Sequence, residues 1–258
     1  MNSFQAPAGE RQAFSMKMEA NMAYQFESRI RFSEVGPDRR LTKVSLVDYF
    51  QDCSTFHSEE CGIGMDCLDA HGCVWMILFW QIDILRLPLL GEQVITRTWP
   101  YDFQAFYGYR NFVLLDGREQ YLAKANSIWA LIDLKTERPI KVLPEVANGY
   151  GLDPRLDMEY LPRKIRLSGE GERMEAFRVG KQHLDTNHHV NNGQYIYMAE
   201  EYLPEGFETG RLCVEYRRQA RLHDVIVPYV YREEKAVTVS LCDEAGVPYA
   251  IVKNGQKE

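Results

Sequence analysis

Hydrophobic and polar residues follow two different periods along the first half of the chain. They alternate between Tyr24 and Phe32, and over residues 44–60 apolar side chains recur every three or four positions. Alternation is typical of a strand with one buried face, whereas the longer period gives a helix an apolar face. We therefore predict a strand from Tyr24 and a helix over 44–60 that ends before Gly62 and Gly64. Four further strands, separated by Gly, Pro and Asp, are predicted at 73–86, 93–102, 107–115 and 120–134.

The same order of elements returns in the second half of the chain. A strand over 173–179 leads through a polar loop, 180–190, into a helix with Asn191 or Asn192 as its N-cap. Strands are predicted after this helix at 211–221, 225–233, 236–243 and 247–253. A strand, a helix and a four-stranded antiparallel meander, present twice, predict an α+β protein. A long helix wrapped by a curved antiparallel sheet, in tandem, is the arrangement called a double hotdog.

The repeat divides the chain into four segments. Residues 23–138 and 172–258 form the two predicted hotdog units, and the Pro- and Gly-rich stretch 139–171 is predicted to be a linker that carries a short helix. Residues 1–22 are polar, and we predict that they form a disordered lead-in. Because two such units can close on each other, a monomer is feasible, and a homodimer is the other expectation.

Composition excludes several classes of protein. With 45% hydrophobic and 26% charged residues over 258 positions, the chain is typical of a globular protein. Its net charge of −7 provides no positive field for non-specific binding of nucleic acid. The longest apolar run, 74–80, is far shorter than the roughly 20 residues that span a bilayer, and residues 1–22 contain no apolar core of a secretory signal. Six cysteines without a C-x-x-C pair favour a reducing cytoplasm over a disulfide framework.

The loop before the second helix has the strongest candidate chemistry. If it is extended, His183, Asp185, Asn187 and His189 lie on one side. An imidazole activates water near neutral pH, and a neighbouring carboxylate or amide fixes its orientation. The helix start that follows supplies unpaired N–H groups that can stabilise an oxyanion.

Other interpretations of these residues stay open. The loop can equally be an ordinary polar turn with incidental histidines, and His183, Asp185 and His189 can be arranged to hold a metal. A second metal alternative is the helical spacing of Cys53, His57 and Cys61, although buried core thiols explain that pattern too. We expect no metal at either place.

The loop resembles the active-site motif of a known enzyme family. Asp185-x-Asn187-x-His189-Val190-Asn191-Asn192, followed by Tyr195, is similar to the motif of the acyl-acyl carrier protein (acyl-ACP) thioesterases of plants and bacteria. Further segments resemble the same family over most of the chain: VWMIL at 74–78, TWP at 98–100, AKANSIWALID at 123–133 and EYRR at 215–218. The resemblance implies hydrolysis of the thioester of a fatty acyl-ACP, which releases free fatty acid and ends chain elongation in fatty-acid biosynthesis. The substrate then carries its own phosphopantetheine arm, and no further cofactor is expected.

The resemblance also implies roles for single residues. Asp185, Asn187 and His189 match the catalytic Asp, Asn and His of the family, whereas Gln219 stands where the family often has Glu. Ala220 stands where it often has Cys, so we expect direct attack by water rather than by a cysteine. His189 then acts as general base or holds the water, Asn187 orients the carbonyl or the water, and Asp185 fixes their geometry. Gln219 can still hold a water, and the helix start at Asn191 and Asn192 is the expected oxyanion site.

A long acyl chain also requires an apolar slot. Trp75 and Trp80 are candidate walls by analogy with the first unit of the family, although ordinary core packing explains each aromatic residue as well. The corresponding loop of the first unit, 38–42, has no Asn or His, so we expect one active site per chain. Basic residues such as Arg39, Arg40 and Lys43 are candidates for docking an acidic carrier protein.

Three competing functions fit parts of the same pattern. An acyl-CoA thioesterase would use the same loop on a different handle. A hotdog hydratase or dehydratase would need a His and acid pair split between the halves, and we find none. A non-catalytic acyl sensor would lack the aligned Asp, Asn and His. Hydrolysis of acyl-ACP is therefore the favoured function.

Overall fold

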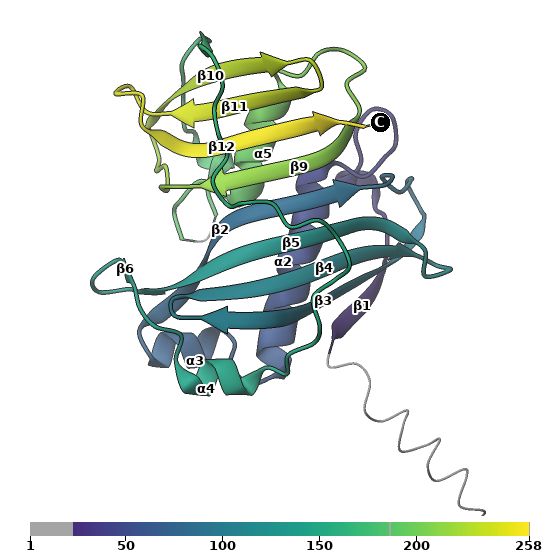
Figure 1. The fold of residues 1–258 in the computed structure, drawn as a ribbon, viewed down its shortest axis with the longest axis vertical. Helices are drawn as coiled ribbons and strands as arrows, with labels where there is room; N and C mark the ends of the chain where they lie inside the picture. Colours follow the sequence, from purple (N-terminus) through teal and green to yellow (C-terminus); the bar gives the residue numbers. More distant parts are fainter. Residues whose placement is uncertain (1–22, 186, 258) are drawn as a thin grey trace, which may run out of the picture.

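The computed structural model describes residues 23–185 and 187–257, so the predicted lead-in 1–22 lies outside the described residues. Its strands form one antiparallel 12-stranded sheet in the order β1-β3-β4-β5-β2-β9-β12-β11-β10-β7, with β6 beside β5 and β8 beside β10 (Figure 1). The first-half strands are β1 (Tyr24–Arg29), β2 (Cys73–Ile84), β3 (Gln93–Gln104), β4 (Tyr107–Asp116), β5 (Tyr121–Asp133) and β6 (Arg138–Pro139). The second-half strands are β7 (Glu172–Arg173), β8 (Phe177–Arg178), β9 (Thr209–Tyr216), β10 (Val225–Glu233), β11 (Ala236–Cys242) and β12 (Pro248–Gln256).

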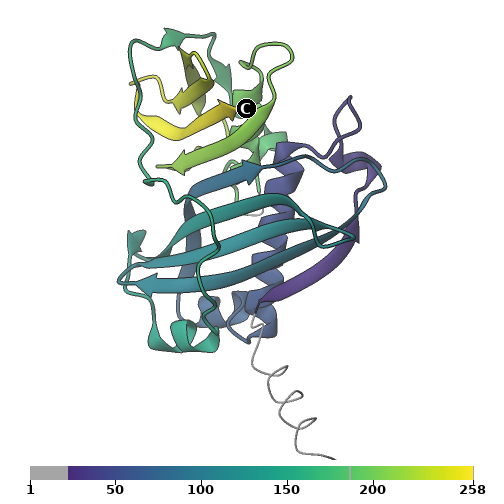
Figure 2. The ribbon, with the colours of Figure 1, turned by 45° about the vertical axis from the view of Figure 1, so that its right-hand side comes forward.

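The two longer helices lie on one side of this sheet (Figures 1 and 2). The helices are α2 (Lys43–Glu60), α3 (Met65–Ala70), α4 (Pro144–Gly149) and α5 (Asn192–Glu200), with short 3-10 turns η1 (Phe32–Glu34) and η2 (Lys181–His183). α2 runs behind β2–β5 and α5 behind β9–β12, as Figures 1 and 2 show. The predicted α+β double hotdog is confirmed, as are the helix at 44–60 and the short helix in the linker.

The order of strands corrects one prediction. Each half was expected to be a four-stranded meander, but β2 pairs with β5 rather than with β3. Its other edge pairs with β9, where Phe79 lies opposite Glu215 and Asp83 opposite Arg211. β2 is apolar along most of its length, which is typical of a strand covered on both faces in the middle of a sheet. Pairing β2 with β9 therefore joins the two halves into one sheet.

Two strand predictions are also wrong in their extent. The segment 173–179 forms two short strands, β7 and β8, because Pro228 of the opposing β10 has no N–H to continue the ladder. The strand expected over 211–221 ends at Tyr216. Beyond it the chain turns, and Ala220 accepts a hydrogen bond from the N–H of Val190 at 2.9 Å.

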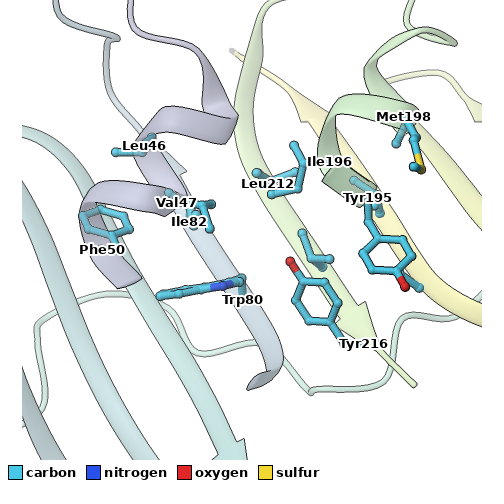
Figure 3. Close-up of a cluster of buried hydrophobic side chains, with 14 of the residues drawn as sticks. Leu46, Val47, Phe50, Trp80, Ile82, Tyr195, Ile196, Met198, Leu212 and Tyr216 are labelled. Atoms are coloured by element: carbon cyan, nitrogen blue, oxygen red, sulfur yellow. The ribbon is translucent and has the colours of Figure 1, made fainter. Parts of the chain in front are cut away.

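The core lies between the two helices and the sheet. Figure 3 shows Phe50 of α2 above Trp80 of β2, and Tyr195 of α5 beside Tyr216 of β9. The linker covers the opposite face of the sheet, where it crosses β2 to β4 (Figures 1 and 2). There the Trp99 indole donates to the carbonyl of Pro154 at 2.8 Å. On the helix side, the start of α5 lies against the middle of α2, where the Asn192 amide donates to Gln51 Oε1 at 2.9 Å.

Candidate functional site

The candidate loop folds as a tight turn. The N–H of Asp185 donates to the carbonyl of His189 at 2.8 Å, and His188 takes a left-handed conformation with φ of 61°. The expected extended segment, with alternate residues on one side, is therefore wrong. This turn, named the 185–190 turn after the positions at its ends, closes between Asp185 and His189 and is followed directly by the N-cap of α5.

Asp185 holds this turn through the backbone. Its Oδ1 accepts the N–H of Asn187 at 2.8 Å and the N–H of His189 at 3.1 Å. A carboxylate that accepts two N–H groups two and four residues ahead fixes the turn in one conformation. The side chains of Asn187 and His189 are thereby positioned relative to each other without a direct contact to Asp185.

Asn187 lies at a cavity of about 320 Å³ in the first half of the molecule. One wall belongs to the sheet and is largely aromatic: Val74, Trp75, Pro100, Phe103, Tyr109 and Trp129. The opposite wall is α2, which contributes Gln51, Ser54, Thr55, Ser58 and Glu59. A residue of the second half thus stands at a pocket built by the first half.

The α2 wall is less polar than its serine and threonine residues suggest, because their hydroxyls bond to the helix backbone. The hydroxyls of Ser54 and Thr55 both donate to the backbone carbonyl of Gln51, at 2.8 and 3.0 Å, and the hydroxyl of Ser58 donates to that of Ser54 at 2.8 Å. Hydroxyls that bond back onto their own helix leave the Cβ and methyl groups to face the neighbouring space. Together with the aromatic sheet wall, this side of the cavity suits an apolar chain.

The two tryptophans predicted as walls occupy different places. Trp75 lines the cavity and packs against Phe103 with ring centroids 6.2 Å apart. Trp80 is fully buried between Phe50 and Phe112 and belongs to the core shown in Figure 3. The substrate-binding role of both tryptophans stays a prediction. Of the two, Trp75 lines the cavity.

His189 is half-buried, and its Nδ1 has no hydrogen-bond partner among the described residues. Its backbone pairs with that of Arg221. This pairing brings the segment after β9 beside the loop, with Gln219 exposed and the N–H of Ala220 bonded to the Tyr195 hydroxyl at 2.9 Å. The structure therefore places the sequence-distant Gln219 segment next to the turn, while the roles of both side chains stay predictions.

The start of α5 is tied to α2. Asn191 is the N-cap, and its Oδ1 accepts the N–H of Gly193 at 2.8 Å. The Asn192 amide donates from Nδ2 to Gln51 Oε1 at 2.9 Å. The oxyanion role expected here stays a prediction, but one of the N–H groups it would use is already bonded to Asn191.

A buried cation closes the α2 side of the cavity. Arg110, which lines the cavity, donates to His57 Nδ1 at 2.9 Å and stacks over Tyr150 at 5.0 Å. Burial and the neighbouring guanidinium lower the pKa of His57 to about 4, so the imidazole is neutral. A guanidinium on the histidine nitrogen opposes a metal cation there, and burial raises the pKa of nearby Cys53 to about 12. Among the described residues no three His, Cys, Asp or Glu side chains come together as metal ligands.

Two further expectations concern a cysteine nucleophile and a membrane-spanning helix. Burial raises the pKa of Cys213 to about 12, so the cysteine nearest in sequence to the Gln219 segment is a neutral thiol at pH 7. Across residues 23–185 and 187–257, no helix combines the length and the apolar character needed to cross a membrane.

Several cavity residues escaped the sequence prediction. Phe103 of β3, Tyr109 and Arg110 of β4, and Tyr150 after α4 come from three separate segments, and only sheet register and the linker bring them together. The α2 wall did leave a signal in the sequence, since Gln51, Ser54, Thr55 and Ser58 follow helical spacing beside the apolar stripe.

Fold and site together define a hotdog protein in which one unit holds an apolar cavity and the other supplies an amide and imidazole loop. The family model of the acyl-ACP thioesterase N-terminal domain matches residues 21–150, and that of the C-terminal domain matches residues 168–246. The chain belongs to the acyl-ACP thioesterase family.

Individual relatives are distant in sequence and close in fold. An acyl-[acyl-carrier-protein] hydrolase of Cuphea viscosissima is 28% identical over 213 residues, which cover 76% of this chain and 52% of the relative. The chain therefore spans about half the length of the curated relatives it matches first. An acyl-ACP thioesterase from Bacteroides thetaiotaomicron superposes with a TM-score of 0.84 at 20% identity, over 92% of this chain and 98% of that one. A 12:0-ACP thioesterase from Umbellularia californica gives a TM-score of 0.79 at 19% identity, with coverage of 92% and 98%.

Proposed function

We propose that this chain hydrolyses the thioester of fatty acyl-ACP and releases the free fatty acid, which ends chain elongation. The observation that carries the proposal is the placement of Asn187 from the second half at the apolar cavity of the first half. An acyl chain in the cavity puts its thioester beside the turn that also positions His189. Family membership supports this reaction over a hydratase or a sensor.

The reaction follows from the groups at the turn. His189 takes a proton from water as the water oxygen attacks the thioester carbonyl carbon. The tetrahedral intermediate expels the sulfur of the phosphopantetheine arm, the C–S bond breaks, and the proton passes from the imidazole to the thiolate. Asn187 orients the carbonyl or the water, and Asp185 maintains the turn through its two N–H acceptor contacts. Gln219 is the candidate to hold a second water from the adjacent segment.

The carrier, the compartment and the assembly are part of the proposal. Acyl carrier protein is the carrier in the names of the plant relatives, and the arm of the substrate makes a further cofactor unnecessary. The six cysteines are free thiols, which supports a reducing compartment such as the cytoplasm. The continuous sheet across both units supports a monomer as sufficient, with a homodimer as the alternative.

The test is a panel of saturated acyl-ACPs beside the matching acyl-CoA esters, assayed for free thiol and free acid, with His189→Ala as control. Faster release from ACP that is lost in the variant supports the proposal. Preference for CoA keeps the chemistry and contradicts the carrier. No release from either substrate contradicts hydrolysis.

A further inference from the structure

The helix of the first unit presents one unused amide donor to the cavity. Among the α2 side chains on the cavity, the hydroxyls of Ser54, Thr55 and Ser58 donate to helix carbonyls. Glu59 accepts the N–H of Met65 at 2.8 Å and has no proton to donate when ionised. Gln51 is the remaining polar side chain of this wall, and it lines the cavity together with Asn187.

The orientation of the Gln51 amide is fixed from the other half of the molecule. Its Oε1 accepts from Asn192 Nδ2 at 2.9 Å. The carbonyl end of the amide is thereby directed at α5, and its NH₂ end has no protein acceptor within the described part of the chain. Because Gln51 is half-buried, this donor has the cavity and its mouth as its surroundings.

Hydrolysis of a thioester needs a donor at the carbonyl oxygen. Negative charge develops on that oxygen as water adds, and a fixed N–H at hydrogen-bond distance stabilises it. At the start of α5, the N–H of Gly193 is already bonded to Asn191 Oδ1, which removes one N–H from that task. Gln51 and Asn187 line the same cavity, and the hydrogen bond from Asn192 fixes the orientation of the Gln51 amide.

We propose that Gln51 Nε2 donates a hydrogen bond to the thioester carbonyl oxygen and stabilises the oxyanion of the tetrahedral intermediate. This inference rests on the proposed thioesterase reaction. It makes the active site a joint product of α2 and the 185–190 turn, with Asn192 as the positioning residue of Gln51.

Two substitutions separate the donor from the shape of the side chain. Gln51→Glu keeps an acceptor for Asn192 but replaces the NH₂ by oxygen, and Gln51→Met keeps the length without either hydrogen bond. We expect kcat on the best acyl-ACP of the panel to fall by about 100-fold in both variants, with little change in KM. Asp52→Asn is the control on the same helix and should stay within about twofold, because Asp52 is exposed and does not line the cavity.

A spectroscopic measurement reports the hydrogen bond itself. With a 13C-labelled thioester carbonyl bound to the slow His189→Ala enzyme, the infrared carbonyl band should be shifted to lower frequency, and adding Gln51→Met should reverse most of that shift. Wild-type-like kcat in both Gln51 variants, a change in KM alone, or an unchanged band overturns the role of Gln51. These results are read against a wild-type chain that hydrolyses acyl-ACP, whereas a wild type without hydrolysis contradicts the proposed function instead.

Discussion

The 36–41 turn and the 185–190 turn have matching backbone hydrogen bonds and dihedral angles, but their side chains differ. The N–H of Gly36 donates to the carbonyl of Arg40 at 2.9 Å, just as Asp185 donates to His189 at 2.8 Å. Arg39 and His188 both have φ of 61°. These matches align position 36 with 185 and position 40 with 189.

The aligned side chains have unrelated chemistry. Asp38 stands where the second turn has Asn187, and Arg40 stands where it has His189. A carboxylate and a guanidinium at these places provide neither the amide nor the imidazole of the second turn. The backbone geometry of the turn is therefore present in both halves. Only the side chains restrict the proposed chemistry to the 185–190 turn.

The two helices differ in the same sense. α2 has 18 residues and α5 has 9, so the last turns of α2 have no counterpart in the second half. Ser54, Ser58 and Glu59, which line the cavity, lie on those extra turns. The contact between the helices is also duplicated in altered form, since Lys43 pairs with Glu200 at 3.1 Å where Asn192 bonds to Gln51. The pocket thus belongs to the first half and the candidate loop to the second half.

The largest expected effect is a loss of activity on substitution in the 185–190 turn but not in the 36–41 turn. Replacing His189 or Asn187 by Ala should lower kcat on acyl-ACP by about 10²–10⁴-fold, the range for loss of general base or carbonyl orientation. Arg40→Ala at the aligned position and His188→Asn, which tolerates the left-handed conformation, should retain kcat within about threefold. Near-normal turnover in both His189→Ala and Asn187→Ala contradicts the assignment of the site to this turn.

The next effect tests the part of α2 that α5 lacks. The folded-state pKa of His57, about 4, lies below its ordinary 6.5 because of burial and the Arg110 charge. Between pH 6.5 and 4 the unfolded chain binds a proton that the folded chain refuses, so acidification costs about 3 kcal/mol of stability. His57→Asn keeps an acceptor for Arg110, and urea unfolding at pH 7 and pH 4.5 should show a smaller loss. The exposed His71, whose pKa a hydrogen bond to the Cys67 carbonyl raises, serves as control, since His71→Asn should leave the loss in place.

A smaller effect lies where aligned positions of the two helices meet. A Cβ at Gly193 would lie 2.8 Å from Cγ1 of Val44, the residue aligned with it. Gly193→Ala should therefore cost about 1–2 kcal/mol in thermal or urea unfolding. Adding Val44→Ala to Gly193→Ala should recover much of that loss of stability. If the destabilisation of the double variant equals the sum of the two single effects, the steric contact between α2 and α5 at this place is contradicted.

The smallest effect concerns how the second turn is held. Asp185→Ala removes the acceptor of two N–H groups and should lower kcat by roughly tenfold through loss of positioning. Asp185→Asn retains Oδ1 and should recover most of the activity. If the reaction needed the carboxylate charge directly, Asp185→Asn would stay as inactive as Asp185→Ala. Gly36 at the aligned position has no side chain, and in its turn Asp38 Oδ1 accepts the N–H of Arg40 at 3.0 Å instead. A dead Asp185→Asn variant with intact folding would contradict a role through the backbone.

Much of the fold was visible in the local pattern. The helical period over 44–60 and an N-cap at Asn191 or Asn192 are short-range signals; the structure confirms the helix and places the N-cap at Asn191. The break between β7 and β8 was missed because its cause, Pro228, lies on another strand. The extended geometry assumed for 183–190 was wrong because the two N–H contacts of Asp185 close the segment into a turn.

The sequence by itself determined that the chain contains two similar α+β units, that the second unit has Asp185, Asn187 and His189 before its helix, and that the first unit has no Asn or His in its corresponding loop. Only the tertiary structure decided that the 185–190 turn stands at the cavity of the other unit, with Gln51 and Arg110 on its walls. The physical reason is distance along the chain. Periodicity and turn chemistry act over a few residues, whereas the pairing of β2 with β9 and the packing of α2 against α5 join segments more than a hundred residues apart.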